Sequence, residues 1–413
     1  MRQKTHMKII RFNSKTIEKI CMRGMLKSRR IEEKVRRIIE DVRLLGDEAV
    51  IKYTKKFDGV KLLPKQLKVS QIEISGAYQN INPNFVSSLK VIIENINRFY
   101  AKTLRKSWKM RAEEGVILGE NYTPIEKVGV YIPAGTAPLV SCVYMTVLPA
   151  RLAGVKKIIL ISPPDKNGFI NPHILVVADL LKVDEIYRVG GAQGIAALAY
   201  GTKTIPRVDK IVGPGNIYVS EAKRQVFGVV DIDMIAGPTE LVIVANRYSD
   251  PKYIVADLSA QAEHRGGLAI LITDSKKLAR EVNSKMDDNG FIILTKNLMQ
   301  AVEIINKIAP EHLEIMVKNP RRLLKGIKNA GAIFLGPYTP TAVGDYVAGP
   351  SHVLPTQGTA RFFSGLSVLD FIKRSHIISY SKKALERVKE PLEKIATIEG
   401  LNKHLESVKV RFN

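Results

Sequence analysis

A glutamine and a histidine lie one helical turn apart at the end of a predicted helix. The segment from Pro251 ends in Gln261-Ala262-Glu263-His264, and its apolar residues recur at three- and four-residue steps. Gln261 and His264 therefore share one face of the helix, just before a predicted strand. An amide oxygen beside an imidazole suits a metal or substrate site, although a solvated helix end can have the same residues.

A carboxylate and an imidazole stand side by side before another predicted strand. Glu311 and His312 follow a proline, and the strand is expected over 313–317. Because proline restricts the backbone at the entry, both side chains are expected near the edge of a sheet, where loops carry function. Asp345 and His352 lie in the next long segment, which has little helix or strand signal. Such a run inside a compact domain is usually functional.

The chain offers nitrogen and oxygen ligands to a metal, but no thiolate cluster. Glu399 and His404 lie five residues apart near the end of the sequence. Cys21 and Cys142 are the two cysteines, and no Cys-x-x-Cys occurs. This excludes a disulfide framework and a thiolate zinc site.

Three glycine-rich turns follow predicted strands of one sheet. They are Pro133-Ala134-Gly135-Thr136, Gly190-Gly191-Ala192-Gln193-Gly194 and Gly213-Pro214-Gly215-Asn216. Each lets backbone amides approach a phosphate at the start of a helix. None is a full Gly-x-Gly-x-x-Gly, and none has the Walker A lysine. Any one of them could be a plain tight turn, but three at one edge of a sheet favour a ligand.

From Glu126 onward, short apolar runs alternate with helical segments, as in parallel sheets covered by helices on both faces. Strands are expected over 128–132, 157–162, 185–189 and 208–212 in a first unit, and over 240–245, 268–273, 290–294, 313–317 and 332–335 in a second. Ahead of them we expect a strand over 7–12 and helices over 14–21, 31–56 and 84–104. The fold class is therefore α/β, with two doubly wound, incomplete Rossmann-like units and small helical additions at both ends.

The composition limits the possible partners and compartments. The formal net charge is +24, and residues 1–111 hold 27 Lys and Arg against 10 Asp and Glu, a net +17. These charges lie in helix-like segments mixed with Glu and lack any glycine-aromatic RNA-binding signature or Cys/His finger, so nucleic acid is not expected as a partner. The sequence shows no signal peptide and no apolar run of membrane-spanning length, so we expect a cytoplasmic protein without membrane contact.

Together these residues resemble the L-histidinol dehydrogenase family, the zinc- and NAD-dependent enzymes of the last two oxidations of histidine biosynthesis. The resemblance covers nearly the whole chain, to the final Val410-Arg411-Phe412-Asn413. It rests on the stretches 128–138, 190–201 with Gly-Gly-Ala-Gln, 212–225 with Gly-Pro-Gly-Asn and Glu-Ala-Lys-Arg-Gln, 236–240, 261–264, 310–313 and 352–356.

The resemblance implies one zinc ion per subunit, held by Gln261, His264, Asp345 and His404. Such a set leaves the ion open to substrate, and in the family the metal orients the imidazole and amine of L-histidinol. These four residues and His312 then contact the substrate. The other residues implied are Thr239, His352 and Glu399 for the substrate and Tyr131, Gln193 and Asn216 for NAD.

The implied reaction is a four-electron oxidation of L-histidinol to L-histidine through L-histidinaldehyde, with two hydride transfers to NAD. His312 can take the hydroxyl proton in the first oxidation. Glu311 is the candidate base that activates water before the second. This makes the expected protein an NAD-dependent oxidoreductase acting on a CH–OH group.

Members of the family are homodimers in which the C-terminal segment completes the partner's site. The expected division is an N-terminal extension (1–23), a first α/β domain (24–127 plus 240–366) with the catalytic and zinc-site loops, a second (128–239) with the NAD-binding turns, and a C-terminal segment (367–413). The chain exceeds the size at which a single core stops growing, which supports a multidomain division.

The sequence departs from the family pattern at three places. Ala134 replaces a common glycine, Thr239 replaces a usual serine but keeps its hydroxyl, and Arg265-Gly266-Gly267 replaces an acid- or glycine-proline pair. Arg265 is expected to point to solvent, because an inward cation would oppose a bound metal.

Two other functions compete with the dehydrogenase. A zinc hydrolase using Glu311 would leave the glycine-rich turns unexplained, and the sequence has no His-Glu-x-x-His or Gly-x-Ser-x-Gly. A basic nucleic-acid-binding protein would leave the Glu-His and Asp-His loops without a role.

Overall fold

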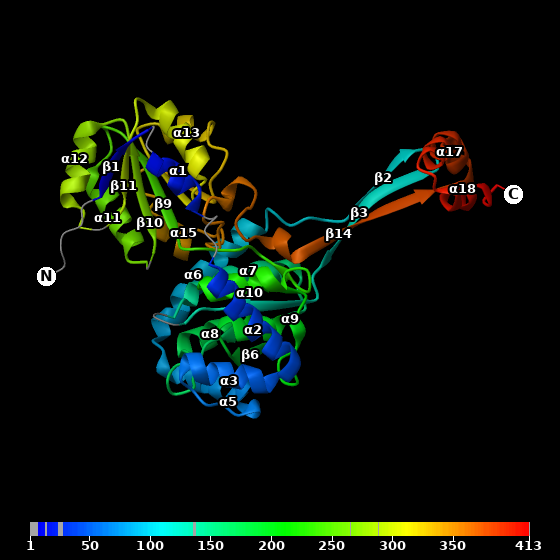
Figure 1. Ribbon diagram of the computed structural model, residues 1–413, viewed down its shortest axis with the longest axis horizontal. Helices are drawn as coiled ribbons and strands as arrows, with labels where there is room; N and C mark the ends of the chain where they lie inside the picture. The colour runs from blue at the N-terminus through cyan, green and yellow to red at the C-terminus, as the bar shows by residue number, and fades with distance from the viewer. Residues whose placement is uncertain are drawn as a thin grey trace.

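Two α/β domains lie next to each other, and a long antiparallel ribbon projects away from both to a small group of helices (Figure 1). The computed structural model describes residues 7–12, 15–23, 28–134, 138–264, 266–287 and 289–412. The expectations for Gly135, Thr136 and Arg265 lie outside these ranges.

The first parallel sheet has the strand order β6-β5-β4-β7-β8. Its strands are β4 (Lys127–Tyr131), β5 (Lys157–Ser162), β6 (Glu185–Arg188), β7 (Lys210–Val212) and β8 (Asp231–Ile232). The central strands β4 and β5 are apolar along most of their length, and alternate side chains of a strand point to opposite faces. Both faces of the sheet are therefore apolar, and helices cover both of them. One face is covered by α5 (Gln71–Ala77), α6 (Pro83–Tyr100), α7 (Val140–Ala153) and α8 (Pro172–Leu180). The other is covered by α2 (Arg29–Leu45), α3 (Asp47–Asp58), α4 (Pro64–Leu67), α9 (Gly191–Tyr200) and α10 (Ile217–Val226).

The second parallel sheet has the order β1-β11-β10-β9-β12-β13. Its strands are β1 (Lys8–Arg11), β9 (Glu240–Ala245), β10 (Leu268–Thr273), β11 (Phe291–Leu294), β12 (His312–Met316) and β13 (Ala332–Leu335). One face packs against α1 (Lys15–Cys21), α13 (Leu298–Ile308) and α14 (Pro320–Leu324). The other packs against α11 (Pro251–Ala262) and α12 (Lys276–Lys285). The chain then forms α15 (Thr341–Tyr346) and returns to the first domain, where Val353, Leu366 and Phe371 join the core.

The projecting arm is an antiparallel sheet with the order β14-β3-β2. Its strands are β2 (Trp108–Glu113), β3 (Val116–Pro124) and β14 (Ile372–Tyr380). It carries α16 (Lys382–Arg387), α17 (Lys389–Ile398) and α18 (Asn402–Lys409) at the end distant from both domains (Figure 1). No helix among the described residues is long and apolar enough to cross a membrane.

The expected fold class, α/β with two parallel-sheet units, is confirmed. The packing differs from the expected grouping of the N-terminal third. The extension 1–23 is not separate, because β1 pairs with β11, and α2 to α6 cover the first sheet rather than the sheet of 240–366. A sequence shows that a helix has an apolar face, but not which of two sheets that face will cover.

Candidate active site

Glu311 and His312 lie where β12 begins, beside the beginning of β9. The two strands are parallel neighbours, with His312 opposite Leu241. Glu311 Oε2 accepts hydrogen bonds from Thr239 Oγ1 at 2.6 Å and from the backbone N–H of Glu240 at 2.8 Å. Both Glu311 and His312 are buried. The pair is therefore fixed at the amino-terminal edge of this sheet.

The two ring nitrogens of His312 have different surroundings. Nδ1 lies 3.1 Å from the carbonyl oxygen of Glu240. A carbonyl can only accept, so Nδ1 carries the proton of the neutral ring and Nε2 is its basic nitrogen. Nε2 has no hydrogen-bond partner among the described residues, and it faces Asp345 Oδ1 at 3.4 Å. The arrangement leaves one nitrogen held by the backbone and the other available to exchange a proton.

The charges around His312 set its protonation. Burial acts to lower its pKa, but the carboxylates of Glu311 and Asp345 outweigh burial and raise the pKa well above the usual value. The two carboxylates therefore favour the protonated form of the ring. His352 is different, because burial is the main influence and lowers its pKa, and its Nε2 is also without a hydrogen-bond partner.

Gln261 and His264 lie at the end of α11, as the sequence predicts. Gln261 is buried in the last turn, and its Nε2 has no hydrogen-bond partner within the described chain. His264 follows the helix and is exposed. A Cβ on Gly267 would lie 2.7 Å from the carbonyl oxygen of Gln261, so the chain can pass this closely only with glycine there. The unpartnered amide is suited to a ligand.

Glu399 and His404 lie far from these residues in the same chain. Both are exposed, and they belong to the α17–α18 group at the end of the arm (Figure 1). Across the parts of the chain that the structure describes, no three or more His, Cys, Asp or Glu side chains are arranged to hold a metal. A single chain therefore does not bring together the four expected zinc ligands.

The residues expected to contact NAD lie at the carboxyl ends of strands in the first sheet. The chain runs from β4 to β5 and β6 on one side, whereas β7, the neighbour of β4 on the other side, is followed by β8 in the opposite direction. Such a switch point, here between β4 and β7, is where open α/β sheets bind ligands. The backbone N–H of Gly191 donates to the buried Tyr131 hydroxyl at 3.4 Å, and burial raises the pKa of Tyr131 to about 12. Gln193 is fully buried, and neither of its amide atoms has a hydrogen-bond partner in the parts of the chain that the structure describes. Asn216 Oδ1 caps α10 by accepting from Tyr218 N and Val219 N.

A buried ion pair that sequence reasoning did not identify fixes the turn after β7. Lys223 Nζ pairs with Asp233 and also donates to the carbonyl oxygen of Gly213 at 3.0 Å. Asp233 Oδ2 accepts from the N–H of Gly213 at 2.7 Å. The pair thus holds both backbone groups of Gly213. Lys223 lies within the Glu-Ala-Lys-Arg-Gln stretch, but the sequence gives no sign that Asp233 is its partner.

The sequence profile described as Histidinol dehydrogenase matches residues 21–412. The chain belongs to the histidinol dehydrogenase family. It is 50% identical over 403 residues to the histidinol dehydrogenase of Listeria innocua, covering 93% of this chain and 94% of that protein. It is 49% identical over 396 residues to that of Clostridium acetobutylicum, covering 92% and 91%. The crystal structure of histidinol dehydrogenase from Elizabethkingia anophelis superposes with a TM-score of 0.92 at 34% identity and covers 99% of both chains.

Membership of the histidinol dehydrogenase family makes the chain an oxidoreductase that acts on the CH–OH group of histidinol in histidine biosynthesis. Among the residues expected at the site, the structure brings Thr239, Glu311, His312 and Asp345 into one contact network. His352 lies within reach of their charges. Sequence reasoning missed Glu240, whose backbone contacts both Glu311 and His312.

Proposed function

We propose that this chain oxidises L-histidinol to L-histidine through L-histidinaldehyde, with Glu311 and His312 as the catalytic residues. One observation carries the proposal. Glu311 and His312 are both held by Glu240, and the unbonded Nε2 of His312 faces the Asp345 carboxylate. A base needs such an unoccupied, oriented atom within reach of the proton that it removes.

In the first oxidation, His312 Nε2 takes the proton of the substrate hydroxyl. The Glu240 carbonyl keeps the Nδ1–H tautomer, so the basic lone pair stays on Nε2. NAD, when bound, accepts the hydride from the alcohol carbon and, in the second step, from the hydrated aldehyde. The proposed NAD contacts are Tyr131, Gln193 and Asn216 of the 128–239 domain, and the unpartnered amide of the buried Gln193 supports this assignment.

In the second oxidation, Glu311 removes a proton from the water that adds to the aldehyde. Its Oε2 already accepts two hydrogen bonds, from Thr239 and Glu240, which orient the carboxylate. Thr239 and His352 are proposed to contact the substrate as well. The neutral His352 ring, whose pKa is lowered by burial, can accept or donate one hydrogen bond there.

Zinc fits the donors that the chain presents. Gln261, His264 and Asp345 would hold it with His404 of the partner subunit, and the ion would orient the substrate's imidazole and amine. Gln261 lies in the last turn of α11 and His264 follows shortly after that helix, so the two side chains belong to the same end of α11, which supports this assignment. So does the position of α17 and α18 on an arm that extends away from both domains of their own chain, because Glu399 directly follows α17 and His404 belongs to α18 (Figure 1). The proposed active molecule is therefore a homodimer in which the 367–413 segments are exchanged.

The test is the amount of NADH formed per L-histidinol consumed by the purified protein, before and after chelation and zinc restoration. We expect two NADH per substrate, with activity lost on chelation and restored by zinc. One NADH per substrate would indicate an alcohol dehydrogenase that releases the aldehyde. No NADH from folded, zinc-loaded protein would contradict the proposal and favour the hydrolase alternative.

A further inference from the structure

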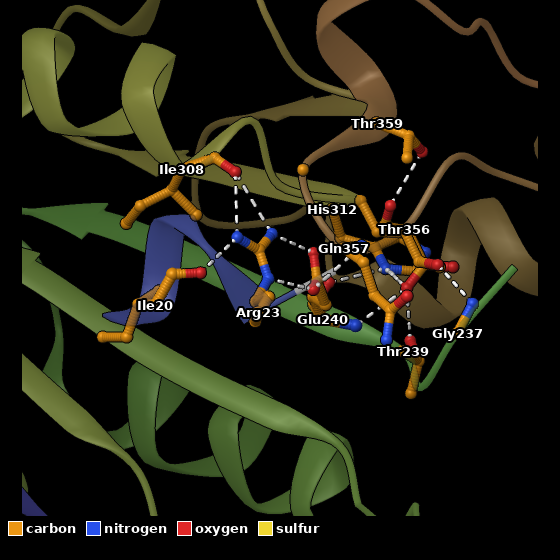
Figure 2. Close-up of polar contacts among 12 residues, drawn as sticks. Ile20, Arg23, Gly237, Thr239, Glu240, Ile308, His312, Thr356, Gln357 and Thr359 are labelled. Carbon is orange, nitrogen blue, oxygen red and sulfur yellow. Dashed lines mark hydrogen bonds and ion pairs between the residues drawn. The ribbon is translucent and has the colours of Figure 1, made fainter. Parts of the chain in front are cut away.

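Glu240 lies at the centre of a network that the reaction chemistry does not explain (Figure 2). Its backbone N–H donates to Glu311 Oε2 at 2.8 Å, and its backbone carbonyl accepts from His312 Nδ1 at 3.1 Å. One peptide segment therefore positions both proposed catalytic residues. A shift of this segment would displace Glu311 and His312 together.

The Glu240 side chain is buried and paired with Arg23. Both carboxylate oxygens accept from the guanidinium, with Arg23 Nη2 at 2.6 Å from Oε2 and Arg23 Nε bonded to Oε1. The side chains of Arg23 and Glu240 are 14% and 4% exposed. The pair joins residues 217 positions apart in the chain, and a two-bond contact fixes the orientation of Glu240 as well as its distance.

Arg23 is itself held by backbone groups. Its guanidinium donates to the carbonyl oxygen of Ile20, at the end of α1, at 2.7 Å. It also donates twice to the carbonyl oxygen of Ile308, the last residue of α13, at 3.1 Å. Arg23 therefore ties two helices to the beginning of β9. Lysine could not do this, because a single ammonium lacks the planar fork of donors.

The same carboxylate also holds the segment that carries His352. The backbone N–H of Gln357 donates to Glu240 Oε1 at 3.0 Å, and Gln357 has a φ of +55°, which non-glycine residues rarely adopt. Beside it, Thr356 Oγ1 accepts from the N–H of Gly237 at 2.6 Å. Backbone in such a conformation persists only where its surroundings enforce it, and it is common at functional sites.

We infer that the Arg23–Glu240 ion pair is a positioning device for catalysis, which fixes the Glu240 backbone and through it the relative placement of Glu311 and His312. The inference rests on the proposed roles of these two residues. Arg23 and Glu240 touch neither substrate nor cofactor in this scheme. Their effect is on geometry, and displacements of about 1 Å in an active site can lower rates by about 100-fold.

The experiment compares Arg23→Met, Arg23→Lys and the double variant Arg23→Met/Glu240→Gln with wild type. kcat and KM are measured with L-histidinol and with L-histidinaldehyde, and Tm is measured for each protein. For Arg23→Met we expect kcat to fall about 10- to 100-fold with both substrates and KM to stay within about threefold, since both catalytic residues move while the proposed zinc ligands Gln261, His264 and Asp345 lie outside the Arg23–Glu240 network. Arg23→Lys should keep an intermediate kcat. Lys19→Met, an exposed cation on α1, is the matched control and should equal wild type.

The double variant separates positioning from simple charge neutralisation. Arg23→Met alone leaves the buried Glu240 carboxylate unpaired, which lowers Tm for electrostatic reasons. Arg23→Met/Glu240→Gln removes that charge, so Tm should recover while kcat stays low. Recovery of kcat together with Tm would overturn the inference, as would a normal kcat in folded Arg23→Met or a loss limited to one substrate. An inactive wild type would instead contradict the proposed function, so the two failures are distinguishable.

Discussion

At the residue scale, the proposed division of labour between Glu311 and His312 can be tested in the two half-reactions. Glu311→Gln keeps an oxygen that can accept from Thr239 and Glu240 but cannot take a proton from water. We expect oxidation of L-histidinaldehyde to fall by about 100-fold or more, and formation of the aldehyde from L-histidinol by less than about tenfold. Rapid-mixing measurements of NADH with each substrate give both values. Glu303→Gln, an exposed change on α13, is the control. Equal losses in both half-reactions would remove the assignment to Glu311.

The residues that could do chemistry were visible in the sequence, because Glu311-His312 and Gln261-x-x-His264 place reactive groups at fixed short spacings. Their supports were not visible. Glu240 has the position of an ordinary first residue of a buried strand, and Arg23 is one basic residue among many near the N-terminus. A bidentate contact across 217 positions has no local pattern, so only the folded chain shows it.

At the element scale, the turn after β7 depends on a glycine. Gly213 has a φ of +116°, and a Cβ there would lie 2.2 Å from the carbonyl oxygen of Tyr131. Gly213→Ala must move this turn away from β4, so we expect a lower Tm. We also expect the KM for NAD to increase by about tenfold or more, because Tyr131 beside the turn and Asn216 at its end both belong to the proposed cofactor site. Gly228→Ala is the matched control, because φ is +99° but nothing lies within 4 Å of the added atom. It should lower Tm and leave the KM for NAD unchanged; an unchanged KM in folded Gly213→Ala would contradict the placement of NAD.

The buried carboxyl group of Glu314 lies near the partly exposed carboxyl group of Asp257 in the second domain. Glu314 on β12 accepts from Thr341 N of α15 at 2.9 Å, and Asp257 of α11 lies close enough for its charge to act on Glu314. Burial, with the Asp257 charge, raises the pKa of Glu314 from 4.5 to about 8. Between pH 4.5 and about 8, Glu314 therefore keeps a proton in the folded chain that it loses in the unfolded chain. The contribution of this proton to the stability of the folded chain is complete below pH 4.5 and is lost as pH rises toward about 8.

Glu314→Gln should remove this pH dependence, because the amide can donate to Asp257 and accept from Thr341 without titrating. We expect the Tm of the variant minus that of wild type to increase by several degrees between about pH 6 and pH 9. Thermal unfolding across this range measures the difference, with the exposed Glu303→Gln as the control. Parallel Tm curves would mean that Glu314 and Asp257 do not share a proton in the folded chain.

Most elements could be predicted because their apolar residues follow a clear period. The expected strands 157–162, 240–245, 268–273 and 332–335 agree with β5, β9, β10 and β13 at both ends. The arm could not be predicted in this way. β2 alternates apolar Trp108, Met110 and Ala112 with charged residues, but every residue of the strand is exposed, so this alternation does not mark a face that a core buries. A ribbon of this kind is defined by its pairing with β3 and β14, which is a long-range property.

At the scale of the whole molecule, the arm places Glu399 and His404 where they cannot serve the site of their own chain, since they lie at its distant end (Figure 1). The α17–α18 group also exposes Ile395, Ile398 and Leu401, apolar side chains that contact with a second copy would cover. Each proposed site then combines Glu311, His312 and Asp345 of one subunit with His404 of the partner subunit.

Mixed dimers of two variants that each oxidise L-histidinaldehyde poorly, assayed with that substrate, give a direct test of this exchange. His404→Ala has an intact core and a defective arm, whereas Glu311→Gln has the reverse. If arms are exchanged, each mixed dimer contains one site with an intact core and an intact arm. When equal amounts of the two variants are refolded together, about half of the dimers are mixed, and half of the sites in those dimers are complete. The mixture should therefore recover about a quarter of wild-type activity. Co-refolded single variants are the control. If each arm serves its own chain, no site in the mixture is complete, and activity stays at the level of the separate variants.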